Sequence, residues 1–165
     1  MDRSRTEPVR LAVSLAAQTL TLLRGADVVK TYAVSTSKHG AGEVAGSFKT
    51  PRGRHIIRAK IGAGAPLNAV FRGRRPTGEI YSAELAQEQP DRDWILTRIL
   101  WLSGTEIGKN RLGKVDTMRR YIYIHGAPDT EPLGSPSSIG CIRMANCDVV
   151  ELFDSVEAGT IVDIA

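Results

Sequence analysis

The chain has 165 residues, a formal net charge of +4 at neutral pH and a hydrophobic fraction of 42%. This length suits one domain that buries most of the surface of its unfolded chain, and neither internal repeats nor low-complexity segments occur. Two cysteines, Cys141 and Cys147, are too few and too close for a disulfide framework, and with scattered histidines they make no zinc signature. We therefore expect reduced thiols, no metal and no cofactor.

Residues 1–8 form a predicted polar tail, followed by one domain over 9–165. Neither a signal-peptide pattern nor an apolar run of membrane-spanning length follows the tail. No membrane association is expected. If Met1 is the natural start, the protein is cytoplasmic; a longer precursor would place it in the periplasm or cell envelope.

The first third of the domain alternates as β-strands do. Apolar residues alternate with small or polar ones over 9–15 and 19–22, and an Arg-Gly-Ala-Asp turn at 24–27 leads to a third such run over 28–35. These runs predict an antiparallel meander. Another strand is expected over 55–61, with His55 on its surface side.

The segment between Pro51 and Arg75 carries seven positive charges and no acidic residue: Arg52, Arg54, Arg58, Lys60, Arg72, Arg74 and Arg75. It predicts a solvated basic face. An alternative is the steering of a substrate that has several carboxylates. Nucleic acid is a poor candidate partner, because aromatic residues are not interleaved with the charges and no nucleic-acid motif accompanies them.

Residues 62–90 are rich in glycine, alanine and proline and then polar, which predicts irregular structure. Long irregular segments are often lids, so part of 67–81 is expected to cover a substrate groove, with Tyr81 either touching substrate or simply packed. The apolar run 94–102 predicts a buried strand, although its length also permits a short helix. Arg119 or Arg120 is expected at the mouth of a site.

The stretch 121–144 is where the chain concentrates its chemistry. A strand over 121–124 ends at His125, and a Pro-, Gly- and Ser-rich loop over 127–138 can return the chain to place Cys141 beside it. An imidazole next to a thiol, whose reference pKa is about 8.5, can take its proton and leave a strong nucleophile. The alternative is a small buried cysteine near a structural histidine.

Gly140 has no side chain, so the amides of Gly140 and Cys141 can point at a developing oxyanion. The residues that carry a family resemblance are His125-Gly126, Gly134, and Ser138-x-Gly140-Cys141-Ile142-Arg143-Met144. Together they resemble the signature of the YkuD-like L,D-transpeptidase catalytic domain. Members of that family use a cysteine to cleave the bond between diaminopimelate and D-alanine in peptidoglycan stem peptides.

The resemblance covers nearly the whole chain and implies a role for each matching residue. Cys141 is the implied nucleophile, His125 its base, and the Gly126 carbonyl the group that orients the imidazole. Arg143 shapes the site or meets a substrate carboxylate. The residues expected to contact substrate are Arg143, Ser138, Ile139, Tyr123 and Tyr81.

One position departs from the family pattern. The residue before Gly140 is usually a second histidine and is Ile139 here. If that position acts through its backbone, activity survives. If its imidazole matters, the protein is slow, altered in specificity or inactive, and a non-catalytic murein- or nucleic-acid-binding protein is then the alternative.

After the nucleophile, Asn146 is expected to cap a helix whose apolar stripe ends before Gly159, and 160–164 reads as a last strand. Cys147 is expected to be buried, or else a redox partner for Cys141. The predicted fold is mainly β: a YkuD-like β-sandwich or open barrel with a helix after the nucleophile loop.

The expected reaction is acyl transfer on stem tetrapeptides through a thioester. Water as acceptor gives an L,D-carboxypeptidase in murein recycling, which we favour, and another stem gives an L,D-transpeptidase forming 3-3 crosslinks. The implied partners are a diaminopimelate-containing tetrapeptide and a carbapenem inhibitor.

Overall fold

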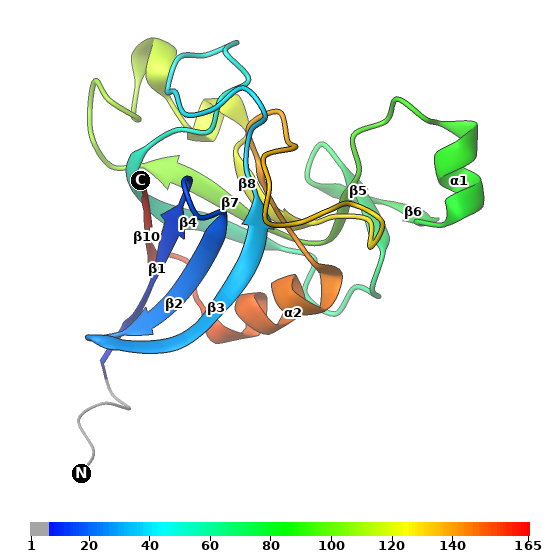
Figure 1. Cartoon of the computed structure of the whole chain (residues 1–165), viewed down its shortest axis with the longest axis horizontal. Helices are drawn as coiled ribbons and strands as arrows, with labels where there is room; N and C mark the ends of the chain where they lie inside the picture. Colours follow the sequence, from blue (N-terminus) through cyan, green and yellow to red (C-terminus); the bar gives the residue numbers. More distant parts are fainter. Residues whose placement is uncertain (1–6) are drawn as a thin grey trace.

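Ten strands form a single sheet in residues 7–165, which the computed structural model describes (Figure 1). Eight of them follow the order β4-β10-β1-β2-β3-β9-β8-β7, and β4 also pairs with β7, so these strands close into a barrel. The remaining two, β5 and β6, extend the sheet beyond β7. The predicted mainly β fold is confirmed, and its barrel is closed rather than open. Residues 1–6 of the predicted tail lie outside the described range.

The strands are β1 (Val9–Ser14), β2 (Thr19–Arg24), β3 (Asp27–Ser35), β4 (Gly53–Ile61), β5 (Ala69–Arg72), β6 (Arg75–Ile80), β7 (Ile95–Gly104), β8 (Tyr123–Gly126), β9 (Ile142–Met144) and β10 (Ile161–Ile164). The helices are α1 (Ala83–Glu88) and α2 (Asn146–Ser155), with 3-10 turns η2 (Gly113–Val115) and η3 (Met118–Arg120).

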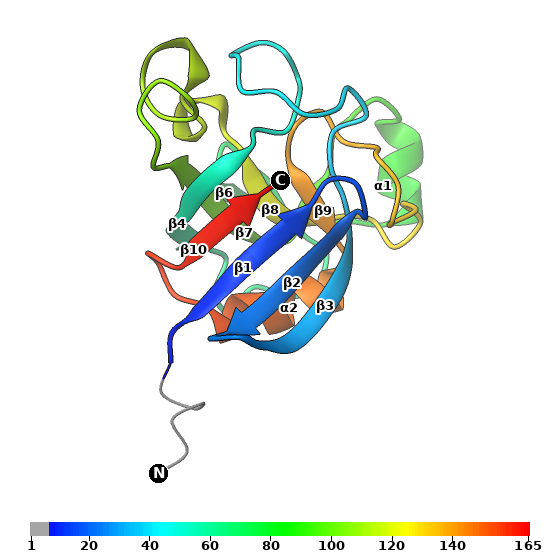
Figure 2. The same ribbon diagram turned by 60° about the vertical axis from the view of Figure 1, so that its left-hand side comes forward.

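The meander β1–β2–β3 follows directly from the alternation of apolar residues. Leu11 pairs with Leu22 and Leu20 pairs with Tyr32 across antiparallel strands, and all four side chains are buried. Residues of one parity therefore line the barrel interior. Figure 2 shows β10 running alongside β1, to which it pairs in parallel.

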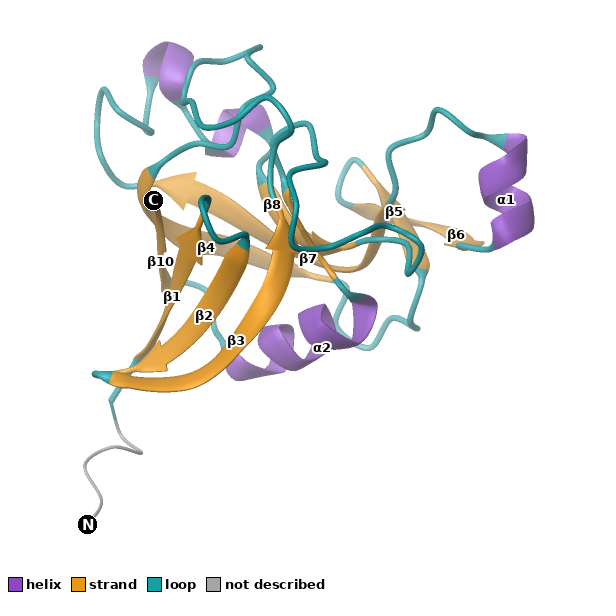
Figure 3. Cartoon of the chain, viewed as in Figure 1, coloured by secondary structure: helices purple, strands orange, loops and turns teal. Residues whose placement is uncertain are grey.

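Helix α2 packs against β7 and β8, beneath the sheet in the view of Figure 3. Its apolar stripe of Val149, Leu152 and Phe153 is buried in the main core, as predicted. The helix ends at Ser155, earlier than expected, because Val156 is already extended. Among residues 7–165, none of the helices is long and apolar enough to cross a membrane.

Two predictions at the start of α2 are wrong. Ala145 occupies the N-cap position and makes no side-chain capping bond, whereas Asn146 is the first helical residue and its side chain is buried. The Asn146 amide turns inward because it meets four polar groups there, which are Thr97 Oγ1, Ala127 O, Asn68 Oδ1 and Asp129 Oδ1. Cys147 is exposed rather than buried.

Residues 62–90 are more regular than predicted. The strands β5 and β6 form a hairpin, and Ser82 caps α1 by accepting a hydrogen bond from Leu85 N at 3.1 Å. Hairpin and helix project from the barrel on the right of Figure 1. Gly73 and Arg74 form the hairpin tip, both with positive φ (+55° and +63°).

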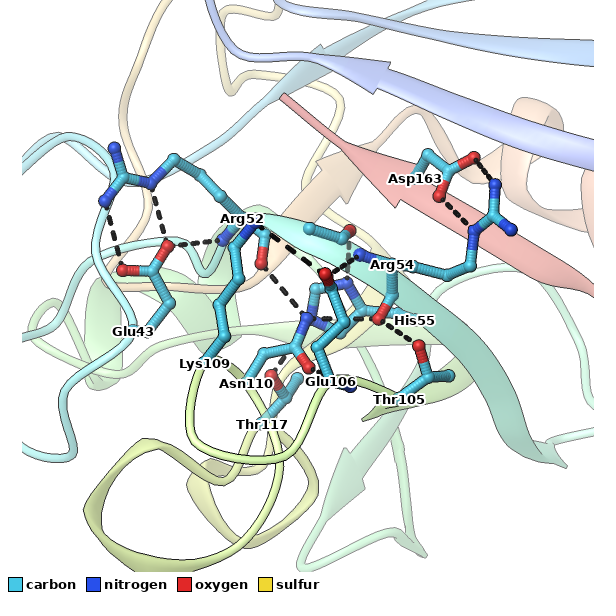
Figure 4. Close-up of polar contacts among 11 residues, drawn as sticks. Glu43, Arg52, Arg54, His55, Thr105, Glu106, Lys109, Asn110, Thr117 and Asp163 are labelled. Atoms are coloured by element: carbon cyan, nitrogen blue, oxygen red, sulfur yellow. Dashed lines mark hydrogen bonds and ion pairs between the residues drawn. The ribbon is translucent and has the colours of Figure 1, made fainter.

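Two of the seven positive charges in the basic segment are paired with carboxylates. Arg52 pairs with Glu43 at 2.8 Å and Arg54 pairs with Asp163 at 2.9 Å (Figure 4). Glu43, nine residues before Arg52, and Asp163, on β10, thus neutralise two of the seven charges locally. The remaining charges are divided between the outside of β4 and the hairpin tip.

His55 is buried, contrary to its predicted surface position. Its Nδ1 lies 3.0 Å from Gly53 O and its Nε2 2.9 Å from Thr117 Oγ1 (Figure 4). The polar connection from β7 to β8 covers this end of β4, with Asn110 donating to the carbonyls of Arg52 and Arg54. Burial lowers the pKa of His55 to about 4, so the ring is neutral.

Candidate active site

The parallel pair β8–β9 brings the two candidate catalytic side chains to adjacent strands. Ile124 pairs with Ile142 in this parallel pair. Cys141, the residue before β9, therefore lies beside Tyr123, the first residue of β8. The strand β8 starts at Tyr123 rather than at the predicted Tyr121, which has a left-handed backbone (φ +55°). The long loop thus returns the chain to the strand that pairs with β8, where Arg143 lies opposite His125 and Cys141 precedes it by two residues.

The Cys141 thiol is held between two backbone groups. Tyr123 N donates to Sγ at 3.3 Å, and Sγ donates to Tyr121 O at 3.4 Å. Burial raises the pKa of Cys141 to about 12, while the Tyr123 amide and the charges of Arg143 and Arg120 act in the opposite direction. The resting group is therefore a thiol, and it needs a base to become a nucleophile.

His125 is 1% exposed and has a defined tautomer. Its Nδ1 lies 2.7 Å from Gly126 O, and since a carbonyl only accepts, Nδ1 carries the hydrogen and Nε2 carries the lone pair. Within residues 7–165, Nε2 has no hydrogen-bond partner although it is buried. Burial lowers the pKa of His125, which keeps the ring neutral and suited to act as a base.

The loop before Cys141 is organised by Ser138. Its buried hydroxyl donates to Cys141 O at 2.6 Å and accepts from Gly140 N at 3.2 Å. Thr50 Oγ1 donates to Gly140 O at 2.9 Å, and Gly140 has φ +133°, which a side chain would strain. The Gly140 amide is thus hydrogen-bonded within the loop rather than directed at an oxyanion. The Ser138 hydroxyl holds the loop together by bonding the backbone of Gly140 and Cys141.

A cavity of about 550 Å³ contains Cys141 in its wall. The other lining residues are Phe48, Gly73, Arg74, Asp93, Ile95, Arg120, Tyr121, Ile122, Tyr123 and Ile139. Tyr123, Ile139 and Arg120 therefore line the same cavity as Cys141. Tyr81 does not line this cavity; it packs edge-on against Trp94, with ring centroids 5.1 Å apart.

Arg143 is already paired with two carboxylates. Its Nη2 lies 2.9 Å from Asp93 Oδ1 and its Nη1 lies 3.6 Å from Glu131 Oε2, and the side chain is only 13% exposed. Nη1 also donates to Ser137 O at 3.2 Å. Arg143 thus links Glu131, in the loop 127–138, to Asp93.

Sequence reasoning missed a buried polar network behind His125. Thr97 Oγ1 donates to Asn146 Oδ1 at 2.6 Å, and Asn146 Nδ2 donates to Ala127 O at 2.9 Å and to Asn68 Oδ1 at 3.0 Å. Thr97 has φ +75° where β7 is irregular opposite β8. A side chain at Gly126 would overlap Asn146. The network therefore fixes the backbone that carries the imidazole, and only Asn146, as an apparent helix cap, gave any sequence signal.

Within the described residues, no group of three or more His, Cys, Asp or Glu side chains could hold a metal ion.

Residues 8–164 match the model of a protein family, the L,D-transpeptidase catalytic domain (YkuD). The chain belongs to this family. Among its relatives, a putative L,D-transpeptidase YkuD from Bacillus subtilis is 30% identical over 159 residues, which are 96% of this chain and 67% of that protein.

Solved L,D-transpeptidases share the fold. The chain matches an L,D-transpeptidase from Mycobacterium smegmatis with a TM-score of 0.57 and 19% identity, over 95% of this chain and 58% of the other. It matches L,D-transpeptidase 3 from Mycobacterium tuberculosis, solved with a faropenem-derived adduct, with a TM-score of 0.58 and 17% identity, over 94% of this chain and 59% of the other. This chain thus spans about three-fifths of each solved protein.

Proposed function

We propose that this L,D-transpeptidase domain is a cysteine acyltransferase that cleaves the bond between diaminopimelate and D-alanine in peptidoglycan stem tetrapeptides. The observation that carries the proposal is the buried neutral imidazole of His125, whose Nδ1 is fixed by Gly126 O and whose Nε2 is unpartnered within residues 7–165. His125 lies on β8, the parallel partner β9 begins directly after Cys141, and Cys141 is one of the residues that line the cavity. This is the arrangement expected of a base that awaits a thiol proton.

In the first half-reaction, His125 Nε2 takes the proton from Cys141 Sγ, and the sulfur attacks the diaminopimelate carbonyl. A carbon–sulfur bond forms and the carbonyl electrons move to oxygen. We assign the Cys141 amide as the donor to that oxyanion, because the Gly140 amide is engaged by Ser138. The imidazolium then returns its proton to the departing amine of D-alanine, the carbon–nitrogen bond breaks, and a thioester remains.

In the second half-reaction, we propose water as the acceptor. His125 takes a proton from water as the water oxygen attacks the thioester, the carbon–sulfur bond breaks, the imidazolium returns its proton to Cys141 Sγ, and the tripeptide leaves. Water needs no binding surface of its own. Hydrolysis therefore requires only the cavity that contains Cys141. The protein would then act as an L,D-carboxypeptidase on soluble fragments during murein recycling in the cytoplasm.

Crosslinking is the second candidate. The side-chain amine of another stem would replace water and give a 3-3 crosslink. That acceptor needs its own groove, and the small cavity of about 200 Å³ beside the site, which shares Phe48, Arg120 and Ile139 with the Cys141 cavity, offers a place for it.

The fold also accommodates β-lactams in related proteins: one solved L,D-transpeptidase is in complex with imipenem and another carries a faropenem-derived adduct. We propose that a carbapenem acylates Cys141 by the same attack on a carbonyl.

The test is a mass-resolved incubation of the purified protein with diaminopimelate-containing tetrapeptide, beside Cys141→Ala. Loss of D-alanine to give tripeptide, absent in the variant, supports hydrolysis, and a dimeric product supports crosslinking. If the protein turns over neither free nor polymeric stems but binds them, it is the non-catalytic murein-binding alternative and the proposal fails.

A further inference from the structure

Arg74 occupies an unfavourable position at the tip of the β5–β6 hairpin. The two-residue turn has φ +55° at Gly73 and φ +63° at Arg74. Such turns favour glycine or asparagine, and a longer side chain in the left-handed region costs about 1 kcal/mol. The contacts of the Arg74 side chain must therefore offset this cost.

Those contacts all reach across to the barrel. The guanidinium carbon lies 4.7 Å from the Trp101 ring centroid and 4.8 Å from the Tyr121 ring centroid, and Nη1 donates to Tyr123 OH at 3.0 Å. Trp101 belongs to β7 and Tyr123 to β8, so the hairpin tip is held against the strands that carry the site. Arg74 thereby lines the same cavity as Cys141.

The other arginines near the nucleophile are already engaged by protein oxygens. Arg120 donates to the carbonyls of Gly42 and Lys49, at 3.2 and 2.6 Å. Arg143 pairs with Asp93 and Glu131, as described above.

Arg74 differs from both. Its one hydrogen bond is to Tyr123 OH, and it forms no ion pair with any acidic residue within 7–165. A guanidinium has five N–H donors, so four of them are available in a cavity that also holds the nucleophile.

We propose that Arg74 binds a free carboxylate of the stem peptide and so determines which stems are accepted. The inference rests on the proposed function and assigns to Arg74 the carboxylate contact that the sequence had offered to Arg143. The planar guanidinium lies over the adjacent rings of Trp101 and Tyr121, and a guanidinium can form two parallel hydrogen bonds with a carboxylate.

The two carboxylates nearest the bond that is cleaved have this chemistry: the terminal carboxylate of D-alanine and the carboxylate at the side-chain end of diaminopimelate. Three tetrapeptides distinguish the two candidates. In one both of these carboxylates are free, in one the terminal carboxylate is amidated, and in one the side-chain carboxylate of diaminopimelate is amidated. Amidation removes the negative charge and one acceptor while keeping the size.

The experiment measures kcat/KM for the three peptides with the wild type, Arg74→Gln, Arg74→Lys and Arg58→Gln. Arg58 is the matched control, because its guanidinium lies 5.7 Å from the same Trp101 ring but outside the cavity. We expect one amidation to lower the wild-type value by about 10- to 100-fold, the range of a hydrogen-bonded charge pair. Arg74→Gln should lower kcat/KM by a similar factor for the peptide with free carboxylates. For the peptide whose amidation affects the wild type, the same substitution should cause no further loss of kcat/KM. Arg74→Lys should regain part of the loss, and Arg58→Gln should match the wild type.

An equal loss by Arg74→Gln on free and amidated peptides would mean that Arg74 only holds the hairpin, and it would overturn the inference, as would no loss at all. Melting temperatures confirm that the variants are folded. If the wild type turns over none of the peptides, the proposed reaction fails separately. Calorimetric binding of the same peptides to Cys141→Ala, with and without Arg74→Gln, then decides the inference by the same pattern of affinities.

Discussion

At the scale of single residues, burial sets the protonation of the catalytic pair. Burial lowers the pKa of His125 and raises the pKa of Cys141 to about 12, so the neutral pair dominates at neutral pH. The pair therefore reacts by transferring a proton when substrate is bound, rather than from a resting ion pair.

The pH dependence of kcat/KM follows from these shifts. A depressed histidine pKa means that the neutral base is retained as the pH falls, so the acidic limb of the profile should have its midpoint below 6.5, the ordinary value of the group. The value of kcat/KM should not fall at alkaline pH up to about pH 9, because the raised pKa of Cys141 keeps the thiol protonated there. Tripeptide release between pH 4 and 9 measures this, and an acidic limb centred above pH 7 would contradict it.

Ile139 offers a second test at this scale. Its side chain lines the cavity and cannot carry a proton, and the proton in the proposed mechanism is carried by His125. Ile139→His should therefore change kcat/KM by less than about threefold, which is under 1 kcal/mol. A tenfold gain in tripeptide release, with an unchanged melting temperature, would mean that the missing imidazole matters.

At the scale of elements, the site depends on how β7, β8 and α2 meet. Asn146, in the first turn of α2, bonds Thr97 on β7 and Ala127 after β8. Asn146→Ala would remove the acceptor for the Thr97 hydroxyl and the side-chain donor to the Ala127 carbonyl. We expect it to lower the free energy of unfolding by about 2–4 kcal/mol and to lower kcat, because His125 loses its fixed backbone.

Urea unfolding and tripeptide release measure the two effects. Cys147→Ala is the control, because it changes the next residue of α2 and its side chain is exposed. A variant Asn146→Ala that matched this control in both measurements would contradict the positioning role of the network.

The same elements show what the sequence can and cannot predict. The meander, the buried strand β7 and the return of the chain from His125 to Cys141 were predicted, because each depends on local alternation or on loop composition. The inward side chain of Asn146 and the ion pairs of Arg143 were not. Their partners lie far away in the sequence, as Asp93 does from Arg143, and only the closed barrel brings them together.

At the scale of the whole molecule, barrel closure buries His55. The strand β4 pairs with β10 on one side and β7 on the other, and Thr117 covers the ring. The folded pKa of about 4 lies below the ordinary 6.5, so His55 contributes fully to stability above pH 6.5. That contribution is lost as the pH falls from 6.5 through 4, in total roughly 3 kcal/mol.

Urea unfolding between pH 7 and pH 4 checks this contribution. The loss of stability on acidification should be smaller in His55→Gln than in the wild type by that amount. His39→Gln, which removes an exposed loop histidine, should behave as the wild type. An identical pH dependence in His55→Gln and the wild type would contradict the assignment.

The most direct test of the account is the mass of the protein quenched during turnover of the tetrapeptide, followed by peptide mapping. We predict an adduct equal to the tetrapeptide minus D-alanine, attached to Cys141, absent in Cys141→Ala and greatly reduced in His125→Gln. The exposed thiol of Cys147 serves as an internal control that should stay unmodified. No adduct under conditions where tripeptide accumulates, or an adduct on Cys147, would contradict the assignment of Cys141 as the nucleophile.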